Sequence, residues 1–294
     1  MVPERVTFES GGDTCVGYLY VESGETPRPC VVLCTGFGGT QDTPSIIATA
    51  QAFADAGYQA VTFDYRNFGE SGGQPRQLVD IAGQLTDIHA AVDFARRLEG
   101  VDPARMVLWG TSLGGGHVVT AAARDARIAV VIAQIPFNGF PKKVEGRSPE
   151  ATLRRLWAMT VDSLKGMLHL RPHYIPAVAG PGELAVMSSR EAQHTIDGMK
   201  SPTWRNLVAP RALFAMMRYK PGDQAADVAA PLLVCLGQRD RETLADTAAE
   251  LAHRAPHGEL LTYPWAHFDF YREDLRQRVT ADQIAFADRA LDHG

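Results

Sequence analysis

The residue whose surroundings most clearly suggest chemistry is Ser112, which lies in the segment Gly110-Thr111-Ser112-Leu113-Gly114. This segment has the pattern G-x-S-x-G, in which a serine stands on a strained turn between a strand and a helix and only very small residues fit two positions away. A serine presented in this way attacks a substrate once a base accepts its proton. We therefore predict that Ser112 is a nucleophile. The alternative is a glycine-rich turn whose serine caps a helix.

The same pattern occurs a second time around Ser71, in Gly69-Glu70-Ser71-Gly72-Gly73. The flanking residues distinguish the two serines. Ser112 follows an apolar run at 106–109 and precedes a small-residue helix predicted at 113–123, whereas Ser71 is followed by glycines and a proline that are typical of a loop. We assign the nucleophile to Ser112.

The base that Ser112 needs is usually a histidine, and the sequence contains nine. In parallel sheets the reacting groups lie beyond the carboxyl ends of the strands. His267 follows the last predicted strand, 259–263, whereas His257 precedes that strand and therefore lies at its opposite end. His267 is the predicted base.

A carboxylate is needed to hold the base in the correct tautomer. Asp240 comes shortly after the predicted strand 232–236, where its side chain could turn towards His267. Glu242 and Asp246 are alternatives that begin or lie on the next helix, and Asp240 could itself be a helix cap. We predict Asp240 as the acid.

Acyl transfer develops negative charge on the carbonyl oxygen, which backbone N–H groups can stabilise. One donor should be Leu113, the residue after the nucleophile. The other should come from the glycine-rich loop 35–39, where we expect Phe37 to supply its amide. The alternative for this loop is a plain glycine turn.

The elements that must position these groups alternate along the chain. Short apolar runs predict strands, and apolar residues three or four apart predict helices between them. The predicted strands are 30–34, 60–63, 106–109, 128–135, 232–236 and 259–263, after an N-terminal edge hairpin, and the predicted helices are 44–56, 81–92, 113–123, 244–251 and 281–291. This order predicts an α/β fold with a doubly wound, mostly parallel sheet.

The alternation is interrupted between residues 141 and 228, which we predict to be a helical cap inserted into a core of residues 1–140 and 229–294. Six of the eight methionines lie in this stretch. Because methionine fills irregular apolar space, we expect a pocket for a bulky apolar group; plain helix packing is the alternative. The predicted substrate contacts are Trp157, Met159, Trp204 and Met216.

Composition limits the possible partners. The 294 residues are 45% hydrophobic and 21% charged, with a net charge of −5, and no basic stripe suggests nucleic acid. Residues 1–10 lack the apolar region of a secretory signal, and no apolar run could span a membrane. The four cysteines are interpreted as buried free thiols of a cytoplasmic protein. We expect a small-molecule substrate and no metal or other cofactor, with a homodimer as one possible assembly.

Taken together, these motifs resemble the α/β-hydrolase superfamily over nearly the whole chain. The resemblance includes the loop 36–39, the stretch 64–71 with its D-x-R-x-x-G-x-S pattern, the segment around Ser112, Asp240, and His267 with the two residues after it. Within the superfamily the chain is most similar to bacterial dienelactone hydrolases, X-Pro dipeptidyl-peptidase-like hydrolases, and fungal polyketide transferases or thiohydrolases. The family usually has histidine before the first loop glycine, where this chain has Thr35.

The resemblance and the motifs together predict a serine hydrolase that cleaves a carboxylic ester, thioester or lactone through an acyl-Ser112 intermediate. Acyl transfer is one alternative. A second is non-hydrolytic elimination or cyclisation on a natural-product intermediate by the same residues, and a third is a non-catalytic ligand-binding protein.

Overall fold

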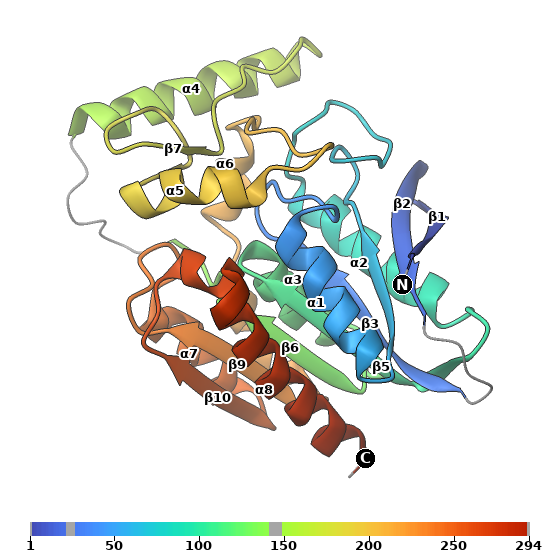
Figure 1. Ribbon diagram of the computed structural model, residues 1–294. Helices are drawn as coiled ribbons and strands as arrows, with labels where there is room; N and C mark the ends of the chain where they lie inside the picture. The colour runs from blue at the N-terminus through green and yellow to red at the C-terminus, as the bar shows by residue number, and fades with distance from the viewer. Residues whose placement is uncertain (1, 22–26, 141–148, 293–294) are drawn as a thin grey trace.

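The protein is described here from a computed structural model that covers residues 2–21, 27–140 and 149–292. Its core is an eight-stranded sheet with the order β1-β2-β4-β3-β5-β6-β9-β10 (Figure 1). These strands are β1 (Glu4–Ser10), β2 (Asp13–Tyr20), β3 (Arg28–Cys34), β4 (Gln59–Phe63), β5 (Val101–Thr111), β6 (Val130–Gln134), β9 (Leu232–Gly237) and β10 (Gly258–Tyr263). The β1–β2 and β2–β4 pairs are antiparallel, and the pairs from β4 to β10 are parallel.

Helices cover both faces of this sheet, because its central strands are apolar on both sides. Along β3, Val31 and Leu33 belong to one apolar cluster, whereas Val32 and Cys34 belong to another. The first cluster includes residues of α1 (Pro44–Asp55) and α8 (Glu273–Asp292), and the second includes residues of α2 (Ile81–Ala95), α3 (Leu113–Ala122) and α7 (Ala245–Arg254). The predicted doubly wound, mostly parallel sheet is confirmed.

Two element boundaries differ by at least five residues from those that the sequence suggested. The final helix begins at Glu273 rather than at residue 281, because its first turns are largely exposed and carry little apolar periodicity. Strand β5 begins at Val101 rather than at residue 106, because its first residues are partly exposed and include Pro103. Apolar pattern locates the buried part of an element but not its exposed ends.

The segment between β6 and β9 lies beyond one end of the sheet in Figure 1, and we call its described residues, 149–228, the inserted segment. It contains α4 (Pro149–Met167), β7 (Val178–Ala179), β8 (Met187–Ser188), α5 (Arg190–Met199), α6 (Ala212–Met216), and the short helices η1 (Pro221–Asp223) and η2 (Ala225–Asp227). The predicted cap also included residues 141–148, which lie outside the described residues. Strands β7 and β8 form a small parallel pair that the sequence did not indicate.

Helix α4 carries apolar residues at helical spacing, but it exposes much of that face. Trp157 and Leu164 are 62% and 52% exposed, whereas Ala158, Met159 and Asp162 are buried. The helix therefore packs through a narrow strip beside the apolar residues rather than through the apolar stripe itself.

All four cysteines are free and buried, as the sequence indicated. Among the residues that the structure describes, none of the helices combines the length and the apolar character needed to cross a membrane.

Candidate active site

Ser112 stands on the turn between β5 and α3, at the carboxyl edge of the sheet. Its backbone has φ 54° and ψ −118°, a left-handed conformation that is rare for residues other than glycine. The amide of Ser112 donates to the carbonyl oxygen of Gln134, and its carbonyl oxygen accepts from the amide of Phe137. These contacts with β6 and the loop that follows hold the strained turn in place.

The glycines on either side of Ser112 are required by close backbone packing. A Cβ atom at Gly110 would overlap the carbonyl group of Gly114. A Cβ atom at Gly114 would lie 2.5 Å from the carbonyl oxygen of Cys34 and would also overlap that of Thr35. The pattern G-x-S-x-G thus reflects a helix that begins directly against the end of β3.

Asp240 and His267 are brought together from the loops after β9 and β10. His267 Nδ1 donates to Asp240 Oδ2 at 2.7 Å, and the two residues are 2% and 7% exposed, respectively. The other carboxylate oxygen of Asp240 accepts the amides of Glu242 and Thr243 at 2.8 and 2.9 Å. Asp240 therefore closes the turn that leads to α7 and orients the imidazole at the same time.

The charges of this pair reinforce each other. Burial lowers the pKa of His267, but the charge of Asp240 and its hydrogen bond outweigh burial, and the pKa lies above its ordinary value. Burial raises the pKa of Asp240, but His267 and the hydrogen bonds from Thr243 outweigh burial, and this pKa lies below its ordinary value. Asp240 is consequently an anion that stabilises a proton on His267.

Ser112 and His267 line one cavity of about 50 Å³. The loop after β3 forms another wall, and a Cβ atom at Gly36 would lie 3.2 Å from the Cβ of Ser112. Phe37 lines the cavity, and Leu113 begins α3 directly after the serine. Among the described residues, no hydrogen-bond acceptor is paired with the amide of Phe37 or of Leu113. Both amides are therefore available to an oxyanion.

Thr35 and Ser71 have structural contacts around this site. Thr35 Oγ1 donates to the carbonyl oxygen of Gly39 at 3.3 Å and so braces the loop that carries Phe37. Ser71 is 2% exposed; its hydroxyl donates to the carbonyl oxygen of Asp64 and accepts the amide of Val16. Ser71 ties the loop after β4 to β2.

The four residues predicted to contact substrate do not line the cavity at Ser112. Trp157 is 62% exposed on α4, and Met159, Trp204 and Met216 are buried within the inserted segment. Packing within the inserted segment, rather than a substrate, accounts for the apolar character of Met159, Trp204 and Met216.

Other methionine and aromatic residues, with one isoleucine, line the cavity at Ser112 instead. Met187 of β8 and Met199 of α5 line the cavity together with Ile46, Phe268 and Tyr271. Both methionines belong to the methionine-rich stretch that the sequence pointed to, and the two aromatic residues closely follow the predicted base. These signals identified the parts of the chain that line the cavity, but not which of their side chains face it.

The chain as a whole is similar to a known protein family and to several known proteins. The model of the family described as Hydrolase_4, serine aminopeptidase, S33, matches residues 25–274. The quorum-quenching protein AidA of Acinetobacter baumannii is 38% identical over 295 residues, which cover 98% of this chain and 95% of that protein. The thiohydrolase aneE of Aspergillus aculeatus is 38% identical over 120 residues, or 41% of this chain and 37% of that protein.

Among solved structures, the α/β hydrolase GrgF from Penicillium sp. sh18 is similar in fold. It superposes with a TM-score of 0.81 at 21% identity, and the match covers 99% of both chains. At this identity the likeness concerns the fold.

Proposed function

The chain belongs to the Hydrolase_4 family of α/β-hydrolases, and we propose that it cleaves a carboxylic ester, thioester or lactone by nucleophilic attack from Ser112. The observation that carries this proposal is the buried contact between His267 and Asp240 beside a cavity that His267 shares with Ser112. The name of one relative is in keeping with it, since aneE is a thiohydrolase.

In the proposed reaction, Ser112 Oγ attacks the acyl carbon and its proton passes to His267 Nε2, the ring nitrogen that Asp240 leaves available. The carbonyl oxygen becomes an oxyanion that accepts hydrogen bonds from the amides of Phe37 and Leu113, each worth about 3–4 kcal/mol. When the bond to the alcohol or thiol breaks, the leaving group takes the proton from His267. Water then attacks the acyl-serine in the same way, and the acid leaves.

For the substrate, we propose a short apolar acyl group in place of the bulky one that the methionine and tryptophan content suggested. The cavity is lined by apolar side chains, but its volume of about 50 Å³ is far below the several hundred Å³ of pockets for large ligands. The inserted segment supplies Met187 and Met199 to its wall, so we propose that this segment acts as a cap over the hydrolase core.

A fluorophosphonate probe followed by intact-mass measurement tests the nucleophile. We expect one adduct on the wild-type protein and none on Ser112→Ala. A Ser71→Ala variant is the matched control and should still be labelled. Labelling that survives in Ser112→Ala would refute the assignment.

Hydrolysis of p-nitrophenyl esters of increasing chain length tests the substrate class. We expect the rate to fall beyond the shortest acyl chains, and Met199→Ala to extend the range. Met217→Ala is the control, because Met217 is 56% exposed and does not line the cavity. A profile that rises with chain length in the wild type would contradict the proposed acyl group, and product analysis would separate hydrolysis from acyl transfer.

A further inference from the structure

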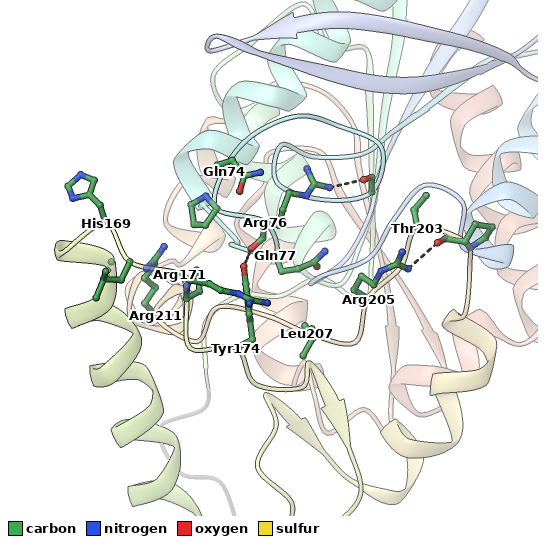
Figure 2. A pocket seen from close by; sticks show the side chains of 16 residues that line it. Gln74, Arg76, Gln77, His169, Arg171, Tyr174, Thr203, Arg205, Leu207 and Arg211 are labelled. Atoms are coloured by element: carbon green, nitrogen blue, oxygen red, sulfur yellow. Dashed lines mark hydrogen bonds between the residues drawn. The ribbon is translucent and has the colours of Figure 1, made fainter.

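A second, larger pocket of about 910 Å³ lies between the loop after β4 and the inserted segment (Figure 2). The loop contributes Gly69 and residues 74–77, and the inserted segment contributes residues from 166 to 174 and from 202 to 211. This pocket shares no lining residue with the cavity at Ser112. Its size is within the range of pockets that hold small molecules or nucleotide-sized groups.

The pocket is strongly cationic. Arg76, Arg171, Arg205 and Arg211 line it, and Figure 2 shows them on both walls. No aspartate or glutamate is among the described residues that line it. Arg211 has a carboxylate neighbour, Asp162, at 3.8 Å. In the part of the chain that the structure describes, the other three arginines have no carboxylate within ion-pairing distance.

Neutral carbonyl groups hold two of these arginines in place. Arg76 donates to the carbonyl oxygen of Gly69 at 2.7 Å, and Arg205 donates to that of Pro202 at 3.0 Å (Figure 2). The hydroxyl of Tyr174 donates to the carbonyl oxygen of Arg76 at 2.8 Å and so joins the two walls. Carbonyl groups fix the positions of these two guanidinium groups without forming an ion pair with them, which favours an anionic ligand.

Gln77, on the wall of this pocket, is an independent sign of a missing partner. It is 7% exposed, and its side-chain carbonyl oxygen has no hydrogen-bond partner within the described residues. Its backbone has φ 60°, and it is held by bonds to Asn67 on one side and Ala209 on the other. This unpaired oxygen is an acceptor, so it requires a donor such as the amide N–H of a ligand's arm rather than a phosphate. Unpaired buried groups on a strained backbone concentrate at binding sites.

The two pockets share a wall. Thr203 lines the cationic pocket and donates to Asp42 through both its amide and its hydroxyl, at 3.0 and 2.8 Å. Thr40 lines the cavity at Ser112 and donates to the same carboxylate at 2.7 Å. A ligand anchored among the arginines is thus separated from the catalytic cavity by one layer of side chains.

We propose that the cationic pocket binds the phosphate groups of a phosphopantetheine thioester, and that the arm of this ligand crosses the layer of side chains around Asp42 so that its acyl end reaches Ser112. Arginine is well suited to phosphate, because its planar guanidinium donates two parallel hydrogen bonds. The inference rests on the proposed function for the reaction itself. Ser112 attacks the thioester carbonyl, the C–S bond breaks, and His267 supplies the proton to the departing sulfur. Water then hydrolyses the acyl-serine and releases the carboxylic acid. Coenzyme A and a carrier protein are two sources of the same chemical group.

Kinetics on two thioesters test the proposal. Butyryl-coenzyme A carries the phosphates, whereas the N-acetylcysteamine thioester of butyrate lacks them. In the double variant Arg171→Ala/Arg205→Ala, we expect kcat/KM for butyryl-coenzyme A to fall about tenfold or more through KM, with little change for the phosphate-free thioester. Arg97→Ala is the matched control, because Arg97 is an exposed arginine just after the end of α2. An equal effect on both thioesters, or no preference for butyryl-coenzyme A in the wild type, would overturn the proposal.

Binding measurements separate this proposal from the proposed function. Calorimetry with Ser112→Ala reports the binding of coenzyme A, phosphopantetheine and inorganic phosphate without turnover. We expect coenzyme A to bind and the added arginine substitutions to abolish binding. Tighter binding of coenzyme A than of phosphopantetheine would assign the site to the free coenzyme, and equal binding would assign it to the arm of a carrier protein. If the wild type hydrolyses the phosphate-free thioester but Ser112→Ala binds none of the three probes, the proposed function stands and the phosphate site is refuted.

Discussion

Replacing Asp240 by asparagine removes one charge and reverses one hydrogen bond at the centre of the site. Asp240 Oδ1 accepts two backbone amides, at 2.8 and 2.9 Å, so the asparagine oxygen should occupy that position. The asparagine NH₂ group then takes the place of Oδ2, which lies 2.7 Å from His267 Nδ1. Because this group donates, it selects the tautomer in which Nε2 carries the proton and cannot accept one from Ser112.

The size of the effect follows from the burial of the pair. With His267 2% exposed and Asp240 7% exposed, water has little access to replace the lost carboxylate. We expect kcat to fall roughly 10³- to 10⁴-fold, or about 4 to 5.5 kcal/mol, with the fold retained because the two amide contacts persist. Steady-state hydrolysis of p-nitrophenyl butyrate gives kcat, and thermal unfolding checks that the variant is folded.

Asp246→Asn is the control for Asp240→Asn. Asp246 is an exposed carboxylate in the first turn of α7, and the sequence left it open as an alternative acid. This variant should retain nearly full activity. A loss of less than tenfold in Asp240→Asn, or an equal loss in both variants, would refute the role assigned to Asp240.

Three further predictions concern the same region. Because the pKa of His267 is raised by Asp240 and the neutral imidazole is the base, kcat/KM should fall as the pH decreases through a value above about 6.5, and Asp240→Asn should move this limb of the pH–rate profile to lower pH. Ser71→Ala should keep its activity but lose about 1–3 kcal/mol of unfolding free energy, measured by urea denaturation, because the buried amide of Val16 loses its acceptor. Gly114→Ala should reduce soluble yield and activity together, since its Cβ would overlap the carbonyl group of Thr35; a fully active, stable variant would contradict the packing argument.

The sequence predicted those parts of the site that depend on local structure and chain order. Ser112, Asp240 and His267 each follow a strand, and parallel strands bring the residues after them to one edge of the sheet. The glycines around Ser112 are required by contacts of the turn itself, so a short pattern is enough to indicate them. This reasoning needs no knowledge of side-chain packing.

The residues that line the cavity could not be predicted in this way. Met159 and Met199 come from the same methionine-rich stretch, but Met159 packs inside the inserted segment and Met199 faces the cavity. Composition indicates that apolar side chains are concentrated in this stretch. The direction in which each side chain points depends on how the helices of the inserted segment pack, and no sheet register fixes that packing. The exposed apolar stripe of α4 has the same explanation, because periodicity defines a face but not what covers it.

The two G-x-S-x-G segments show which property makes a serine available for attack. Both follow strands, and both serines lie near the same edge of the sheet. At Ser71 the hydroxyl donates 2.6 Å to the carbonyl oxygen of Asp64 and accepts the amide of Val16 at 2.9 Å, so its hydrogen-bonding capacity serves the backbone. At Ser112 the strained turn uses backbone groups alone for its contacts, and the hydroxyl is left to the cavity that it shares with His267. The pattern selects a shape of turn, and the partners of the hydroxyl decide whether that turn holds a structural bridge or a nucleophile.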